Sequence, residues 1–497
     1  MNKKLAKIFG LFLAITCITS CAVDWGENES TDSDSIEEIS YTGNEKDINV
    51  WVYKAGYGQG WIDKACYLYE KSHPGQYRFR IKANSRMFDT VKTTLTSNNC
   101  DADIVLVAGY DYLNLSSTGK LAELSSIFES TIPGTDTKCK DVIDEAQYKF
   151  RLMGENKDKI YGVPWQEANA NGFVYNKKMF RDAGCEVPTT MDEFFAVCDK
   201  LDAKGYKPLV YGGGQQDAYT ALFVPQWTSQ AYGKDYMTNT FQKYASPEIY
   251  NTTKPGKTMA YQTLAKLLKG NTASGNSIAL TGSKAFTAQN AQKEFIFGHA
   301  AMDLCGNWFS IEMKTLLNET PDFEYGFFSL PHLTANKQTL SGEDSQYVTY
   351  SLESSVLAIP AASKNIDVAK DFLLSMFTKE SYQTFVEENK GLGRPISVEI
   401  DESKLDEYSL SCYKTSALSH EHDQVVCEVS DAIMAINGYL GVANFCGGDF
   451  YLNIINAVDY NAALNIANNA ASDELQFALS MWDASKGNWK DEYLVLR

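Results

Sequence analysis

The sequence predicts an α/β fold built from two domains, and three observations lead to this prediction. The chain has 497 residues, which is more than one hydrophobic core usually serves. Hydrophobic residues make up 44% and charged residues 22% of it, as in an ordinary globular protein. After residue 47, strand patterns alternate with helix patterns. This order favours a largely parallel sheet covered by helices.

The first hundred residues of this region alternate strand, helix and strand. Ile48–Tyr53 is apolar and β-branched, and 60–72 carries apolar residues at i, i+3, i+4 and i+7, which predicts an amphipathic helix. Tyr77–Ala83 alternates apolar and charged residues, and Asp103–Ala108 is a buried β-branched strand. Strands in this order are joined by right-handed crossovers.

Open α/β sheets bind ligands beyond the carboxyl ends of their strands. Two loops therefore become candidates for ligand contact, Tyr53–Trp61 after the first strand and Gly109–Tyr112 after the third. Further along, Thr190 and Glu193 form a predicted capping box at a helix start. A strand over Ser355–Pro360 precedes another amphipathic helix.

The N-terminus reads as a targeting segment. Three lysines precede an apolar run over Ile8–Ile18, which is too short to span a membrane. Ile18–Cys21 resembles a bacterial lipobox, in which a peptidase cleaves before the cysteine and the thiol is diacylated. The alternative is an ordinary secretory signal with a chance cysteine. The polar, acidic residues 22–46 are predicted to form a flexible tether.

Composition excludes several function classes. The net charge is −18 and the pI is near 4.8, which argues against nucleic acid and against a polybasic membrane surface. Nine cysteines follow Cys21, an odd number, so at least one thiol is unpaired. There is no C-x-x-C motif, so a zinc ribbon or redox site is unsupported. Neither a metal site nor a cofactor is predicted.

The segment Tyr161–Leu201 carries the most specific motifs. It contains Y-G-V-P, then G-x-x-Y-N-K, F-x-x-A-G and P-x-T-x-x-E-F in this order. The segment resembles the sugar-binding family of extracellular solute-binding proteins of bacterial ABC importers. The resemblance continues in Phe297–Trp308, Tyr325–Pro331 and Ser355–Phe377. It covers roughly residues 47–395 and weakens in the last hundred.

The resemblance implies a periplasmic-binding-protein-like fold, with two lobes, a hinge and a ligand cleft between them. The signal peptide would be 1–21 and the tether 22–46. The first lobe would comprise 47–167 and 327–392, and the second 168–326 and 393–497. The resemblance further implies a monomeric receptor that carries out no catalysis. It would be anchored by lipid (palmitate) through Cys21 to the extracytoplasmic face of the cell membrane. There it would hand a carbohydrate to ABC permease subunits.

Sugars present hydroxyl rims and apolar C–H faces, so their sites need flat aromatic rings and polar side chains. The resemblance places a stacking tryptophan at Trp308, with Asn307 beside it. It also places the first crossover at the cleft floor. The candidates there are Trp165, Gln166, Glu167, Asn169 and Asn171.

Further candidates lie in loops of the two predicted lobes. Tyr57 and Trp61 flank glycines that permit a close backbone approach. The remaining candidates are Tyr110 and Tyr112 after the third strand, Tyr219 and Trp227 after a Gly-Gly-Gly run, and Arg394 near a crossover. Each has a plainer interpretation: core packing for the aromatic residues and a salt bridge for Arg394.

Three other functions remain as alternatives. A binding protein for a polyamine, iron or a peptide would share the lobes, but a polyamine site would need several carboxylates in the cleft. A surface glycoside hydrolase would need two carboxylates poised across a glycosidic bond, and no pair stands out among the 63 acidic residues. A purely structural lipoprotein would leave a hinge topology unexplained.

Overall fold

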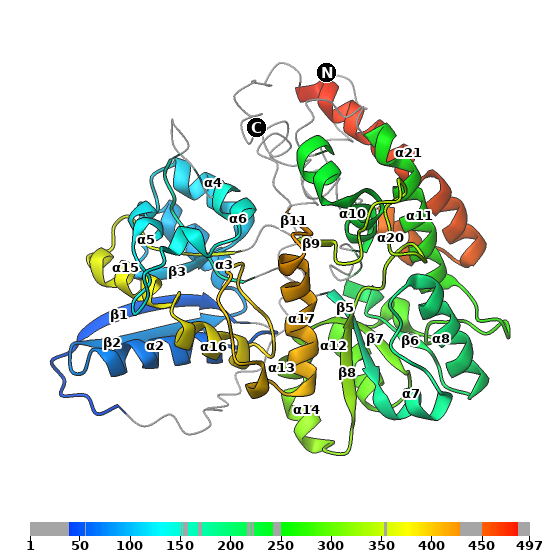
Figure 1. Ribbon diagram of the computed structural model, residues 1–497, viewed down its shortest axis with the longest axis horizontal. Coiled ribbons are helices and arrows are strands. Elements are labelled where there is room, and N and C mark those ends of the chain that lie inside the picture. Colours follow the sequence, from blue (N-terminus) through cyan, green and yellow to red (C-terminus); the bar gives the residue numbers. More distant parts are fainter. Residues whose placement is uncertain are drawn as a thin grey trace.

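The computed structural model describes residues 39–54, 56–150, 152, 158–166, 171–215, 220, 223–241, 250–351, 355–427 and 450–485. This part of the chain is built on two main β-sheets, one of five strands and one of four. Figure 1 shows them in two lobes side by side. The α/β prediction is confirmed. Cys21 lies outside the described residues. Among the described residues, none of the helices combines the length and the apolar character that a membrane crossing requires.

The first lobe is built on a five-stranded sheet with the strand order β2-β1-β3-β10-β4. β1 pairs in parallel with β2 and β3, as the strand–helix–strand order predicts, and β10 runs antiparallel to β3 and β4. The strands are β1 (Lys46–Tyr53), β2 (Tyr77–Asn84), β3 (Ile104–Val107), β4 (Val163–Pro164) and β10 (Val356–Ala358).

Helices cover both faces of this sheet. One face buries α2, α5, α15 and α16 in a common core, and the other face packs against α3 and α4. The helices of this lobe are α2 (Gly60–Ser72), α3 (Met87–Thr96), α4 (Gly109–Ser117), α5 (Ser125–Glu129), α6 (Glu145–Phe150), α15 (Ile366–Ser375) and α16 (Lys379–Glu388).

The second lobe is built on a four-stranded sheet with the order β6-β7-β5-β8, which leaves β8 at an edge. Its strands are β5 (Asn171–Asn176), β6 (Leu209–Val210), β7 (Met302–Gly306) and β8 (Tyr325–Ser329). A separate pair, β9 (Thr349–Ser351) and β11 (Val425–Cys427), runs in parallel. The two main sheets draw on separate stretches of chain, while the predicted lobe boundaries remain a prediction.

This second sheet is also covered on both faces. One core joins it to α7, α8, α10, α11, α20 and α21, and the other joins it to α12, α13 and α17. The helices are α7 (Lys177–Ala183), α8 (Met191–Ala203), α10 (Phe223–Tyr236), α11 (Tyr250–Lys269), α12 (Ala288–Ile296), α13 (Phe309–Glu312), α14 (Lys314–Glu319), α17 (Glu407–Glu421), α20 (Phe450–Asn456) and α21 (Tyr460–Ser485).

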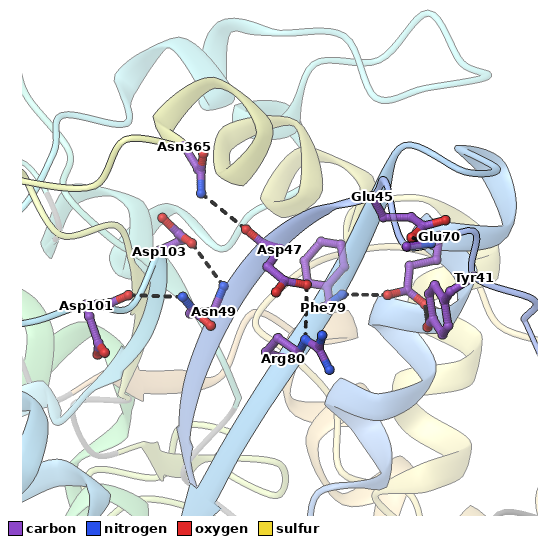
Figure 2. A network of polar contacts seen from close by, with 11 residues as sticks. Tyr41, Glu45, Asp47, Asn49, Glu70, Phe79, Arg80, Asp101, Asp103 and Asn365 are labelled. Atoms are coloured by element: carbon purple, nitrogen blue, oxygen red, sulfur yellow. Dashed lines mark hydrogen bonds and ion pairs between the residues drawn. The ribbon is translucent and has the colours of Figure 1, made fainter.

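The chain is tied to the first lobe before β1 begins (Figure 2). The Tyr41 hydroxyl donates to Glu70 at 2.8 Å, and the other carboxylate oxygen of Glu70 accepts from the Phe79 amide at 2.6 Å. At the start of β1 itself, Asp47 pairs with Arg80 of β2 at 3.0 Å. Tyr41, within the segment predicted as tether, therefore already contacts the lobe.

His332 fixes the segment that follows β8. Its ring is 3% exposed. Nδ1 accepts from the Thr334 amide at 3.0 Å, and Nε2 lies 3.1 Å from the Ser345 carbonyl, to which it donates as a neutral imidazole. Burial lowers the pKa of His332 to about 4. The neutral ring is thus the form that this packing holds.

We expect His332 to make stability depend on pH in mildly acidic solution. The unfolded imidazole takes up a proton below its ordinary pKa of about 6.5, whereas the folded one resists protonation until about pH 4. Its contribution is therefore complete above pH 6.5 and should fall by on the order of 2 kcal/mol by pH 4.5. Urea unfolding of the wild type and His332→Gln at pH 7 and 4.5 measures this. Equal losses in both proteins would contradict it.

Candidate functional site

An aromatic cluster connects the two lobes. Tyr57 follows β1, and its ring packs edge-on against Trp165 of the first lobe and Trp308 of the second, with centroid distances of 5.9 and 5.7 Å. The Tyr57 hydroxyl donates to Asn307 Oδ1 at 3.3 Å. Four predicted site residues from three distant parts of the sequence therefore meet at one place, which we call the aromatic cluster: Tyr57, Trp165, Asn307 and Trp308.

The end of β7 positions the second-lobe members of the cluster. Asn307 and Trp308 follow Gly306 directly, and Trp308 caps the start of α13. Asn307 is buried, and its backbone carbonyl accepts from Tyr408 at 2.9 Å. Because Asn307 is held this way, the half-buried Trp308 is presented toward the first lobe.

Two glycines make room for the Trp308 indole. A Cβ atom on Gly306 would lie 2.1 Å from Trp308 Cζ3, and one on Gly56 would lie 3.0 Å from Trp308 Cδ1. Neither position accepts a side chain unless the ring moves. The glycine-rich loop was predicted to permit a close approach to the backbone. Trp308 makes such an approach, to Gly56.

We expect Gly306→Ala to displace the indole while leaving the tryptophan in place. The added methyl group overlaps the ring, so affinity for the ligand should fall by roughly 1–2 kcal/mol, about ten- to thirtyfold. Gly298→Ala is a control for a general loss of stability in the same lobe, since it strains a backbone with φ of +78° but adds no atom against Trp308. Titration calorimetry measures both. Equal affinity in the wild type and Gly306→Ala would show that the indole does not need its present position.

Two neighbouring residues of the first lobe, one in the cluster and one beside it, carry polar atoms that no described residue satisfies. Trp165 Nε1 and Gln166 Oε1 are buried and have no hydrogen-bond partner among the described residues. One is a donor and the other an acceptor. Burying such groups unpaired costs about 1–3 kcal/mol each. A ligand hydroxyl, which both donates and accepts, would remove this cost.

Electrostatics keep the cluster neutral. Burial raises the pKa of the Tyr57 phenol well above its ordinary value, so the ring stays protonated and able to donate. Burial also raises the pKa of Glu312, which accepts from Gln292 at 2.6 Å. Among the described residues, no group of three or more His, Cys, Asp or Glu side chains is placed to hold a metal ion.

Three predicted aromatic contacts lie in the core instead. Trp61 is 1% exposed and backs Trp165 from α2, with its ring also against Phe385. Tyr112 is fully buried, because α4 begins directly after β3 where a loop was predicted, and its hydroxyl accepts from the Tyr161 amide. Trp227 is fully buried in α10 and donates to the Pro331 carbonyl. Their positions fit the plainer interpretation, core packing, and their part in ligand binding stays a prediction.

Arg394 is also buried in the core, and it forms no salt bridge with a described residue. It is 2% exposed and donates to the carbonyls of Met376 and Pro164. The end of α15 supplies the first carbonyl and β4 the second. Burial lowers its pKa to about 10. The guanidinium thus joins the end of α15 to β4.

The remaining candidates cannot be placed as side chains. Tyr110 lies in α4, and Asn171 begins β5 opposite Gly306. Glu167, Asn169 and Tyr219 lie outside the described residues. These five stay predictions.

The comparisons with known proteins identify the family of the chain. The family model described as bacterial extracellular solute-binding protein matches residues 53–383, about two thirds of the chain. A multiple sugar-binding protein of Streptococcus mutans is 26% identical over 48% of this chain, and the match spans 52% of that protein. The diacetylchitobiose binding protein DasA of Streptomyces coelicolor is 25% identical over 75% of this chain and 77% of its own length.

A solved structure shows the same fold. The apo form of RafE from Streptococcus pneumoniae superposes with a TM-score of 0.61 and 19% identity. The match covers 88% of this chain and 98% of that one. At this identity the likeness concerns the two-lobed architecture alone.

Proposed function

Because the chain belongs to the bacterial extracellular solute-binding proteins, we propose that it captures a carbohydrate, most simply an oligosaccharide, and delivers it intact to an ABC permease in the membrane. The observation that carries this proposal is the aromatic cluster, which takes Tyr57 and Trp165 from one lobe and Trp308 from the other. Two relatives whose names describe sugar binding, from Streptococcus mutans and Streptomyces coelicolor, support the choice of ligand.

The chemistry of the cluster suits a sugar better than the alternatives. Its rings offer flat apolar faces for C–H groups, and Trp165 Nε1 and Gln166 Oε1 need a partner that donates and accepts. A polyamine would need carboxylates, and the members of the cluster are uncharged. Each sugar unit of a glycan offers apolar C–H faces for the rings and hydroxyls that both donate and accept hydrogen bonds.

Binding would involve closure of the lobes around the ligand. The Tyr57–Asn307 hydrogen bond is a contact between the lobes that such a motion would make and break. The predicted side chains at Glu167, Asn169, Asn171, Tyr110 and Tyr219 would complete the site. Delivery requires a permease and an ATPase on other chains.

We further propose that the protein is a monomeric lipoprotein held at the outer face of the membrane through diacylated Cys21. The lipobox-like Ile18–Cys21 and the acidic segment after it support this anchor. Metabolic labelling with palmitate should mark the wild type and not Cys21→Ser.

The proposal is tested by titration calorimetry on the chain from residue 22 onward with Cys21 absent. The panel is a set of mono- and oligosaccharides, with spermidine and a peptide pool as controls. We expect micromolar or tighter binding of one glycan, recovered with its length unchanged.

The other outcomes each favour a different function. Binding of spermidine or peptide alone would keep the fold and replace the ligand class. A glycan recovered in pieces would instead identify a hydrolase.

A further inference from the structure

The second lobe contains a cavity that is separate from the aromatic cluster. Its volume is about 290 Å³. It lies beyond edge strand β8, between the loop that precedes α8, the helices α10 and α17, and the segment 346–350. No residue of the aromatic cluster lines it, and neither does any residue of the first sheet.

One buried hydroxyl in this cavity has no partner. Thr349 of β9 is 9% exposed, and its Oγ1 makes no hydrogen bond to any described residue. The neighbouring Gln226 is different, since its amide donates to the Val348 carbonyl at 2.6 Å and accepts from the Tyr350 amide at 2.5 Å. A buried hydroxyl that no described residue satisfies, beside a satisfied amide, is open to a partner supplied by a ligand.

The charged side chains that line the cavity have one sign. Lys337 and Lys414 line it, and no aspartate or glutamate does, although the chain as a whole carries −18. Lys414 also pairs with Glu402 at 3.2 Å, but Glu402 does not line the cavity and both side chains are about half exposed. His332 is the third basic residue of the lining, and its ring is held neutral, as described above.

Two carboxylates act from outside the lining. Glu193 accepts from the Thr189 amide and interacts with Lys337. Asp344 interacts with His332. Within the lining itself, the two lysines are the charged groups that could pair with an anion.

The cavity walls include aromatic rings that can pack against the carbon skeleton of a small molecule. Phe223, Phe328, Tyr347 and Tyr350 all contribute to the lining. The volume is at the lower end of the range for small-molecule sites, about 300–1,000 Å³. We propose that this cavity is a second binding site, for a small organic anion whose acidic group pairs with Lys337 and Lys414 and whose polar atom bonds Thr349.

The test uses the chain from residue 22 onward and three probes that share one sugar ring: glucuronate, glucose 6-phosphate and, as the uncharged control, glucose. Calorimetry should detect at least one of the two anions and should detect it equally in the wild type and in Trp308→Ala. Which anion binds separates a carboxylate from a phosphate ligand. If neither anion binds at millimolar concentration, or if Trp308→Ala abolishes anion binding, the proposal is wrong. The second result would place the anion in the aromatic cluster.

Two sets of variants locate the site. Lys337→Gln with Lys414→Gln should weaken anion binding by about tenfold or more, while the double change Lys364→Gln with Lys404→Gln, at exposed lysines elsewhere, should leave it unchanged. Equal affinity in the two double variants would overturn the proposal.

Thr349→Val keeps the test informative if the lysine variant fails to fold. It removes a hydroxyl that has no partner, so the melting temperature should stay the same or rise while anion affinity falls. A lower melting temperature with unchanged affinity would mean that Thr349 has only a structural role.

Discussion

Replacing Lys257 by methionine should lower the free energy of unfolding by about 3–5 kcal/mol. Lys257 Nζ lies 2.6 Å from Glu474, and the two side chains are 1% and 0% exposed. Tyr261 also donates to Glu474. These contacts join α11 to α21. Lys257→Met therefore leaves the Glu474 carboxylate buried without its cation. Burial already raises the pKa of Glu474, because it disfavours the charged form. Urea unfolding at pH 7 measures the loss.

Two controls separate the buried charge from lost packing. Lys257→Met combined with Glu474→Met removes both charges, and it should recover most of the stability because a buried ion pair and apolar side chains of similar volume are often equivalent. Lys178→Met breaks an exposed pair with Asp182 and should cost less than about 1 kcal/mol. If the single Lys257 variant loses no more than Lys178→Met does, Glu474 does not depend on Lys257.

The elements that the sequence predicts well are those specified by local pattern. The helix predicted over 60–72 is found as α2 (Gly60–Ser72), and the apolar positions that predict it, such as Ile62 and Tyr69, are buried. The capping box of Thr190 and Glu193 is present in both of its hydrogen bonds. In each case the residues that form the element lie within one or two turns of each other.

The aromatic side chains were harder to assign, because burial depends on partners far away in sequence. Tyr112 and Trp227 follow turn signals just as Tyr57 does, yet their rings fill cores. Arg394 is satisfied by two backbone carbonyls from β4 and the end of α15, which no side-chain pattern reveals. Only the resemblance to a family of known topology singled out Trp308.

The cavity beside β8 could not be predicted at all. Its lining comes from five stretches of chain, near residues 188, 226, 332, 348 and 415. None of them carries a site motif alone: they are a loop before a helix, a helix interior, a strand end with the segment after it, a short strand and a helix face. The unpaired Thr349 hydroxyl becomes visible only when these stretches are packed together.

Replacing Trp308 by alanine should weaken sugar binding by about 3 kcal/mol, roughly a hundredfold. The indole sits where both lobes meet, against Tyr57 and over Gly306 and Gly56, and central aromatic residues of this kind dominate the energetics of binding. It is half-buried and follows a strand end, so the fold should tolerate its loss better than the ligand does. Titration calorimetry against the preferred glycan measures the change.

Two further variants show whether the effect comes from stacking. Phe297→Ala removes an aromatic ring of the same lobe that is 56% exposed, and it should leave affinity unchanged. Tyr57→Phe keeps the ring and removes only the hydroxyl that bonds Asn307, so it should cost about 1 kcal/mol. If Tyr57→Phe costs as much as Trp308→Ala, the lobes are held by that hydrogen bond and the ligand does not stack on the indole. If Trp308→Ala binds as tightly as Phe297→Ala, the sugar lies elsewhere in the cleft.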